Sequence, residues 1–110
     1  MNDASGSPQE QAVGLEIDRL IHEPARLNIM INLFVVESAD YVFLMNQTGL
    51  SWGNLSVQIT RLEECGYLLV EKGYKGRKPH SMVTMTEAGR EAFKRYRSRM
   101  KAILDGLPGS

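Results

Sequence analysis

The sequence predicts a mainly α-helical domain that carries one small β-hairpin. Three observations lead to this fold class: two helical stretches joined by a short turn that contains glycine, a strand pair with a basic tip, and a long amphipathic stretch near the C-terminus. In order along the chain, the expected elements are helix, helix, helix, turn, helix, hairpin and helix. A helix, a short turn and a second helix, followed by a hairpin, form the layout of a winged helix-turn-helix.

Length and composition limit the classes of protein to which the chain can belong. A chain of 110 residues fits one domain with one core, and its 43% hydrophobic and 24% charged residues are ordinary for a globular protein. The single cysteine, Cys65, excludes an internal disulfide and a thiol pair for zinc, so a cytoplasmic location is the default. No apolar run reaches the roughly 18 residues of a membrane helix, and the N-terminus lacks the pattern of a signal peptide.

The net charge of zero hides an uneven distribution along the chain. Residues 1–40 contain two basic and seven acidic side chains, a net charge of −5, whereas residues 41–110 contain eleven basic and six acidic ones, a net charge of +5. A basic half is compatible with a polyanionic partner such as nucleic acid. Ordinary solvated surface is the alternative explanation, and charge alone does not exclude it.

The first third of the chain is expected to contain an arm and two helices. Residues 1–12 are small and polar, which is typical of a flexible arm. From Leu15 to Ile21 the apolar spacing becomes helical, and Pro24 either ends this helix or begins the next one. The stretch 24–38 is apolar on nearly all sides, so it should be buried centrally or covered by a second subunit.

A helix-turn-helix unit is predicted in the middle of the chain. Asp40 is expected to cap a short helix over residues 42–48, which Gly49 ends in the left-handed conformation. Ser51 then caps the next helix, which runs to about Cys65. The apolar stripe of this second helix should face the core, and it consists of Leu55, Ile59 and Leu62.

A hairpin and a last helix follow the helix-turn-helix unit. The strands should flank a basic, glycine-rich, mobile tip, with Pro79 at the tip or at the first residue of a strand. Thr86 is expected to cap the last helix, which has one apolar face and is basic elsewhere. These predictions place the folded domain at residues 13–104 and a frayed C-terminus at residues 105–110.

Three segments carry a resemblance to a known family: "LIHEPARLNIMINL", "TGLSWGNLSVQITRLEECGYL" and "GRKPHSMVTMTEAGREAF". Together they resemble the MarR/ArsR-like winged-helix transcriptional regulators, and most closely their short single-domain group. The match runs from about Leu15 to Leu104. The resemblance implies a dimeric DNA-binding repressor or activator, in which the helix at residues 51–65 would enter the major groove. The hairpin tip at residues 72–80 would reach the minor groove or the phosphates.

The chain departs from the family pattern at three positions on this recognition helix. Val57 and Gln58 stand where relatives usually have an arginine or lysine and a histidine, and Trp52 replaces a residue that is usually small or acidic. We consider three roles for Trp52: it covers the edge of the core, stacks on a sugar or phosphate, or anchors a partner protein. The last role favours a rival hypothesis, a winged-helix protein–protein interaction module with weak or no DNA binding.

The helix face opposite the apolar stripe is expected to read DNA. Asn54 and Gln58 can each bond an adenine edge bidentately, and Val57 can contact a thymine methyl group. Arg61 can bind guanine or a phosphate, while the helix N-terminus with Ser51 is a natural phosphate contact. A solvated polar face is the alternative. The expected DNA-binding residues on this helix are Ser51, Trp52, Gly53, Asn54, Val57, Gln58 and Arg61.

The hairpin tip concentrates four cations within seven residues. Set among glycines and a proline, these cations can follow phosphates or insert an arginine into a narrow A·T-rich groove. Ordinary solubility of an exposed hairpin is the alternative. The expected wing contacts to DNA are Lys72, Lys75, Arg77 and Lys78.

The first and last predicted helices have more apolar surface than a domain of this size needs for its own core, which predicts a homodimer. A two-fold dimer would place two recognition helices about 34 Å apart, one turn of DNA. An effector, if one is sensed, would have to bind at the dimer interface, because the chain has no separate ligand domain. The expected interface residues are Leu15, Leu20, Ile21, Phe93, Tyr96, Met100, Ile103 and Leu104.

The reactive side chains of the sequence do not form a recognisable enzyme active site. His22 and His80 lie 58 positions apart, and with one cysteine they give no metal-binding spacing. No serine is coupled to a base by a recognisable motif. We therefore expect no enzymatic activity, no cofactor and no metal. The expected partners are double-stranded DNA and a second copy of the chain.

Overall fold

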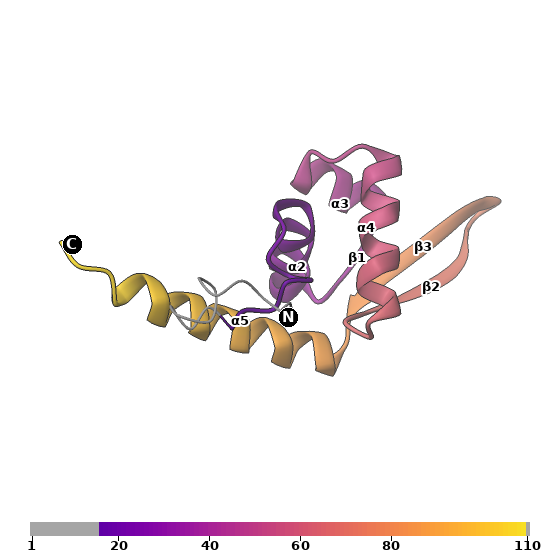
Figure 1. Ribbon diagram of the computed structural model, residues 1–110. Helices are drawn as coiled ribbons and strands as arrows, with labels where there is room; N and C mark the ends of the chain where they lie inside the picture. The colour runs from indigo at the N-terminus through magenta and orange to yellow at the C-terminus, as the bar shows by residue number, and fades with distance from the viewer. Residues whose placement is uncertain (1–15, 110) are drawn as a thin grey trace, which may run out of the picture.

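The computed structural model describes residues 16–109, so the predicted arm at residues 1–12 and Leu15 lie outside the described residues. The helices are α2 (Pro24–Val36), α3 (Tyr41–Thr48), α4 (Trp52–Glu64) and α5 (Glu87–Asp105), and the strands are β1 (Ser38–Asp40), β2 (Leu68–Lys75) and β3 (Lys78–Met85). The sheet is antiparallel with the order β1-β3-β2. The β2–β3 hairpin and α5 project in opposite directions from a centre formed by the other helices (Figure 1). This is a winged helix-turn-helix, so the predicted fold class is confirmed.

The segment 16–23 forms turns where the sequence predicted a helix. Asp18 explains the difference, because its Oδ1 accepts hydrogen bonds from the backbone N–H groups of Leu20 (2.9 Å) and Ile21 (3.2 Å). Such local side-chain bonds compete with the helical ones. The other carboxylate oxygen of Asp18 accepts a hydrogen bond from the Tyr67 hydroxyl. Burial, together with this bond, raises the pKa of Tyr67 to about 12.

Pro24 begins α2, which decides between the two roles predicted for it. Its fixed φ suits the first helical turn, where its missing N–H costs nothing. The Glu23 side chain caps the helix by accepting a hydrogen bond from the backbone N–H of Arg26 at 2.9 Å. The cap satisfies one of the N–H groups that the first turn of any helix leaves unpaired.

Strand β1 is a second difference from the sequence prediction. Its three residues pair antiparallel with residues 82–84 of β3, and three residues between two helices give too little alternation to be recognised as a strand. Just before β1, Glu37 adopts a positive φ of 70°, and its carbonyl accepts a hydrogen bond from the Met85 N–H at 2.9 Å. This bond ties the end of α2 to the end of β3.

The caps of the helix-turn-helix unit are those that the sequence predicted. Asp40 Oδ1 accepts from the Phe43 N–H at 2.8 Å at the start of α3, and Gly49 ends that helix with a φ of 73°. Ser51 Oγ accepts from the Asn54 N–H at 3.2 Å at the start of α4. Because a side-chain cap contributes about 1 kcal/mol, local chemistry determines where the turn between the two helices begins and ends.

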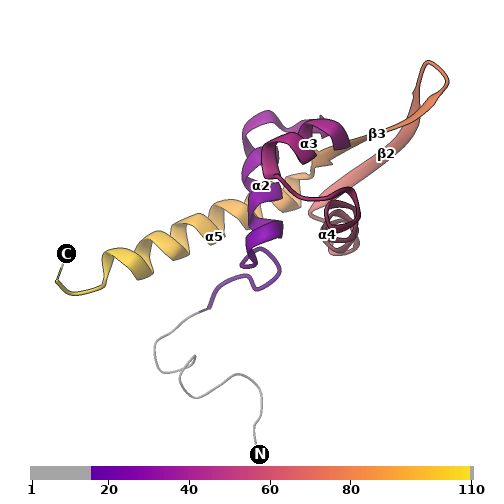
Figure 2. The ribbon, with the colours of Figure 1, turned by 90° about the horizontal axis from the view of Figure 1, so that it is seen from above.

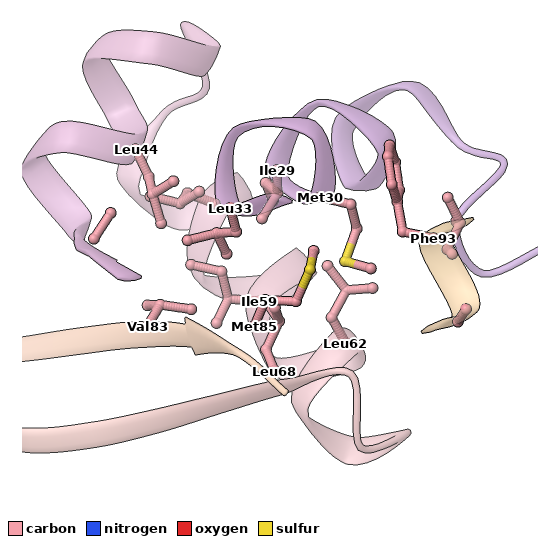
Figure 3. Close-up of a cluster of buried hydrophobic side chains, with 14 of the residues drawn as sticks. Ile29, Met30, Leu33, Leu44, Ile59, Leu62, Leu68, Val83, Met85 and Phe93 are labelled. Atoms are coloured by element: carbon pink, nitrogen blue, oxygen red, sulfur yellow. The ribbon is translucent and has the colours of Figure 1, made fainter. Parts of the chain in front are cut away.

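One hydrophobic core joins the helices to the sheet (Figure 3). The predicted stripe of α4 is fully buried, and it meets side chains from α2 and from the base of the hairpin. Full burial of an aliphatic side chain contributes about 1.5–3 kcal/mol, so this stripe fixes which side of α4 faces outward. The fully buried residues of these elements are Leu55, Ile59, Leu62, Ile29, Met30, Leu33 and Val83.

The first turn of α5 packs closely on the turn that follows α4. A Cβ added at Gly89 would lie 2.2 Å from the Tyr67 carbonyl oxygen, so only glycine fits there. The same carbonyl accepts a hydrogen bond from the Thr86 N–H at 3.0 Å, and the Thr86 hydroxyl donates to the Gly66 carbonyl at 2.6 Å. These contacts set the direction in which α5 leaves the domain.

Gly89→Ala should destabilise the fold by about 1–3 kcal/mol, because the added methyl group meets backbone atoms that are themselves hydrogen-bonded. Gly53→Ala is the matched control: Gly53 has open space at its Cβ position, and the change should be neutral or stabilising by up to about 1 kcal/mol. Thermal unfolding followed by circular dichroism measures both variants. Equal melting temperatures would contradict the close approach at Gly89.

Candidate nucleic-acid interface

The outer face of α4 brings together the residues that the sequence predicted on the recognition helix. Six of these residues are exposed and Gln58 is partly buried, in contrast to the fully buried stripe of the same helix. Arg61 is the only cation of this face, which otherwise offers amides, a hydroxyl and two apolar side chains. The exposed residues are Ser51, Trp52, Gly53, Asn54, Val57 and Arg61.

Arg26 holds part of this face from α2, and the sequence analysis did not identify it. Its Nη1 donates to Gln58 Oε1 at 2.8 Å, and Gln58 Nε2 donates to Asn54 Oδ1 at 3.1 Å. Arg26 Nε also donates to the Leu20 carbonyl at 2.5 Å. The only sequence signal was an isolated cation in the first turn of an apolar helix. The contact with α4 spans 32 residues and cannot be read from local spacing.

The β2–β3 hairpin carries the four predicted cations in its outer half, away from the core (Figure 1). The strands pair as far as Lys75 and Lys78, around a two-residue turn in which Gly76 has a φ of 66°, as such turns require. All four cations are exposed, and none forms a salt bridge within residues 16–109. Pro79 is the second residue of β3, whereas the sequence predicted it at the tip or at the first residue of a strand. It lies outside residues 82–84, the part of β3 that pairs with β1.

Asp40 connects strand β3 of the wing to the start of α3. Its Oδ2 lies 3.1 Å from His80 Nε2, while its Oδ1 caps the helix. The backbone hydrogen bond from Phe43, followed by the hydrogen bond with His80, holds the pKa of the Asp40 carboxyl below its ordinary value. The carboxylate therefore stays charged at neutral pH and links β1, α3 and β3. His80, which pairs with Gly73 in the outer half of the hairpin, thus has a structural contact with the start of α3.

A cleft of about 440 Å³ lies between α3, α4 and the base of the wing. Trp52 borders it, and its ring packs against Tyr41 with the ring centroids 5.1 Å apart and the ring planes tilted by 58°. Trp52 remains 58% exposed, and Tyr41, on which it packs, lies against the hydrophobic core, so the ring sits at the edge of the core with one side open to solvent. The cleft is also lined by Met45, Val70 and His80.

The residues predicted to form a dimer interface fall into two groups. Ile21 is fully buried, and Phe93 and Tyr96 are each only 7% exposed. Phe93 packs on Phe34 with ring centroids 4.8 Å apart. These three side chains are therefore core residues of the protomer and not free surface for a partner, which corrects the prediction for them. The second group is partly buried or exposed, and it consists of Leu20, Met100, Ile103 and Leu104.

Comparisons with known proteins agree with this geometry. The sequence pattern of the winged helix DNA-binding domain family matches residues 25–104. The structure of a transcriptional regulator homologue from Pyrococcus horikoshii OT3 is 32% identical to this chain with a TM-score of 0.80, over 92% of this chain and 99% of that one. The chain belongs to the winged helix DNA-binding domain family. The family comprises DNA-binding regulators and is not a class of enzymes, as the sequence analysis expected.

Two further proteins are similar to this winged helix protein, one in sequence and one in structure. An uncharacterized protein of Methanocaldococcus jannaschii is 28% identical over 78 residues, which are 71% of this chain and 85% of that protein. The structure of a MarR-family transcriptional regulator from Silicibacter pomeroyi is 20% identical with a TM-score of 0.61, over 88% of this chain and 60% of that one. That structure shows the shared fold, in agreement with the MarR-like resemblance.

Two structures of the same fold contain ligands. Reduced AbfR bound to DNA is 18% identical with a TM-score of 0.66, over 93% of this chain and 70% of that one. NadR in complex with 4-hydroxyphenylacetate is 16% identical with a TM-score of 0.63, over 96% of this chain and 82% of that one. At these identities both structures show a common fold only.

Two further findings concern the part of the chain that the structure describes. Within residues 16–109, no helix is long and apolar enough to cross a membrane. Over the same residues, no three histidine, cysteine, aspartate or glutamate side chains gather as they would to hold a metal ion.

Proposed function

We propose that the chain is a sequence-specific transcriptional regulator that binds double-stranded DNA as a homodimer in the cytoplasm, on the nucleoid. In this proposal α4 enters the major groove, and the wing at residues 72–80 contacts the backbone or the minor groove. One observation carries the proposal: with the stripe of α4 buried, six of the seven predicted residues are exposed and Gln58 is partly buried beside them. The DNA-bound structure of AbfR, a protein of the same fold, supports it.

Base recognition in this proposal comes from the exposed side chains of α4. Asn54 presents an amide, and Val57, which is 51% exposed, presents methyl groups that can contact a thymine methyl. Arg61 can bind a guanine edge or a phosphate, and the helix N-terminus capped by Ser51 can contact a phosphate. A face with a single cation contributes little to electrostatic attraction, so most of the affinity must come from elsewhere.

The wing supplies the positive charge that α4 lacks. Each strand of the hairpin has eight residues and spans about 26 Å, which carries the tip away from the helices (Figure 2). The contact between Asp40 and His80 holds β3 of the hairpin against the start of α3. Exposed cations on such an arm can follow phosphates or enter a narrow minor groove.

The double variant Arg77→Ala/Lys78→Ala should bind every duplex more weakly and with a smaller salt dependence. Each lost phosphate contact lowers the slope of log K against log salt by about 0.9, so a change of about two is expected. Fluorescence anisotropy with one duplex across a salt series measures the slope. Lys94→Ala, which removes an exposed cation of α5 paired with Glu91, is the control and should leave the slope unchanged. Absence of salt-dependent binding by the wild type to any duplex would contradict the proposed function.

The distal half of α5 provides the surface proposed for homodimerisation. Beyond its buried first turns the helix leaves the body of the domain (Figure 1, Figure 2). We propose a second copy of the chain as its partner, because the apolar side chains of this distal half continue the face that packs on the protomer's own core. A two-fold dimer would also give each DNA half-site a recognition helix. Ile31 and Val35 of α2 are also exposed and apolar, as expected if a second subunit covers them. The distal stripe consists of Met100, which still packs partly on the core, Ile103 and Leu104, and the exposed Leu107 follows the end of α5.

Leu104→Glu should convert a dimer into a monomer that remains folded, because Leu104 is 57% exposed in the protomer and a charge is costly only where a partner covers it. Duplex affinity should fall by on the order of a hundredfold, since two half-sites are no longer bound by one assembly. Sedimentation at micromolar concentration measures the oligomeric state, and Leu104→Met is the control that keeps an apolar side chain. A monomeric wild type, or a variant that sediments like it, would exclude this interface.

A small-molecule effector is a further part of the proposal. It would bind at the dimer interface, because residues 16–109 form one winged helix unit and no separate ligand domain. The structure of NadR in complex with 4-hydroxyphenylacetate supports effector binding by this fold. At 16% identity, the chemistry of that ligand does not transfer to this chain.

Trp52 favours a second candidate function, a protein–protein interaction module with weak or no DNA binding. Its ring is 58% exposed, packs against Tyr41 and borders the cleft between α4 and the wing. Tryptophan is enriched among the residues that dominate binding energy at protein interfaces. In the first function, by contrast, the same ring would stack on a sugar or phosphate at the edge of the groove.

Trp52→Ala should weaken duplex binding by roughly tenfold if the first function holds, the effect of one good contact. The matched control is Val42→Ala, which trims a 65% exposed apolar side chain of the same cleft and should leave DNA binding unchanged. For both variants, the affinity for a duplex is measured by titration, and the proteins that bind are identified in parallel by affinity capture. Loss of a captured protein from Trp52→Ala, with DNA binding intact, would replace the first function by the second.

A further inference from the structure

Arg26 connects the first turn of α2 to the outer face of α4. Its side chain is only 12% exposed, and three oxygen atoms lie around the guanidinium. Nε donates to the Leu20 carbonyl at 2.5 Å, and Nη1 donates to Gln58 Oε1 at 2.8 Å. Glu23 Oε1 lies 4.0 Å from Nη1 and adds a weak ion pair. The cation is therefore engaged within the protein, and little of it is available to a DNA phosphate.

The charge of Arg26 determines how the amides on α4 are oriented. A guanidinium donates hydrogen bonds and accepts none, so Gln58 must turn its oxygen toward Arg26. The Gln58 amide nitrogen then faces Asn54 and donates to its Oδ1 at 3.1 Å. Within residues 16–109 the Asn54 amide nitrogen has no hydrogen-bond partner. The first bond of this series involves a charge and is about twice as strong as a neutral one, so it sets the direction of the second.

We infer that Arg26 is a positioning residue for DNA readout, which sets Asn54 and Gln58 to present N–H donors to the base edge. The inference rests on the proposed function, in which α4 enters the major groove. The donors that remain are both N–H groups of the Asn54 amide and one of the Gln58 amide. Guanine presents two acceptors in the major groove, N7 and O6, whereas cytosine presents a donor, N4. The preferred base facing this pair is therefore guanine.

This inference changes the role that the sequence predicted for Gln58. A bidentate contact to adenine uses both the oxygen and the nitrogen of one amide, and Gln58 Oε1 is already bound to Arg26. Gln58 is also partly buried, whereas Asn54 is exposed. Gln58 thus transmits an orientation from Arg26 to Asn54, and Asn54 makes the larger part of the base contact.

The first experiment compares Arg26→Met with Arg77→Met, two variants that each remove one cation. Relative affinities are measured for duplexes that carry each base pair in turn at every position of a site selected from random DNA. The wild type should prefer guanine at the position facing Asn54 by on the order of tenfold, and Arg26→Met should reduce this preference to about threefold or less. The salt slope of Arg26→Met should equal that of the wild type. Arg77→Met should show the opposite pattern, a smaller slope with the guanine preference retained.

The second experiment uses Gln58→Glu, which reverses the polarity of the series. A glutamate still accepts from Arg26 but cannot donate to Asn54, so the Asn54 amide should turn its nitrogen toward the glutamate and its oxygen toward the DNA. The preference at that position should move from guanine to a base with a donor in the major groove, cytosine or adenine. The added negative charge weakens binding to all duplexes alike, so the readout is the ratio between bases. This variant also carries the test if Arg26→Met does not fold.

Three outcomes would overturn the inference. Uniformly weaker binding and a smaller salt slope in Arg26→Met would make Arg26 a phosphate contact. Unchanged base preferences in both Arg26→Met and Gln58→Glu would show that the Arg26–Gln58–Asn54 contacts are structural only. A wild type that binds no duplex at low salt would remove the proposed function itself, and with it the role of Arg26 in readout. That last result differs from the first two, in which the wild type binds DNA normally.

Discussion

The burial of one stripe of α4 is the constraint on which the rest of the structure depends. Leu55, Ile59 and Leu62 are fully buried, and at about 1.5–3 kcal/mol each they outweigh any interaction available to the polar face within the protomer. The helix therefore cannot rotate to bury this face, and Asn54, Val57 and Arg61 remain exposed while Gln58 is partly buried against Arg26. The core determines how α4 is presented, and the outer face is free to vary in chemistry.

Two long-range contacts hold the side chains around this helix in place. One joins α2 to α4, and the other joins the start of α3 to β3. Arg26 orients the amides of α4 from the side of α2, and the Asp40–His80 contact fixes β3 of the wing against the start of α3. The proposed functions of the three projecting parts then differ in physical terms. The face of α4 distinguishes bases, the wing supplies charge, and the distal part of α5 doubles the number of both by bringing in a second copy.

The features that depend on neighbouring residues could be predicted from the sequence. The caps at Asp40 and Ser51, the ending at Gly49 and the stripe of α4 all follow from short spacings, and the structure contains them. Features that depend on distant contacts were missed: β1 exists because β3 pairs with it, and Arg26 meets Gln58 across 32 residues. The predicted helix before Pro24 failed for a local reason that periodicity does not detect, since Asp18 bonds the backbone there. The burial of Ile21, Phe93 and Tyr96 within the protomer could be seen only in the tertiary structure. In a sequence, an apolar helix face looks the same whether the protomer's own core or a partner subunit covers it.

Hydroxyl-radical footprinting of the wild-type protein on a duplex selected from random DNA tests directly whether a homodimer binds DNA through two copies of α4. We expect two protected windows related by a two-fold axis, with their centres about 10 base pairs apart, and protection that disappears as salt is raised. A single window would contradict the homodimer with paired recognition helices. No protection at any salt concentration would contradict DNA binding through the outer face of α4.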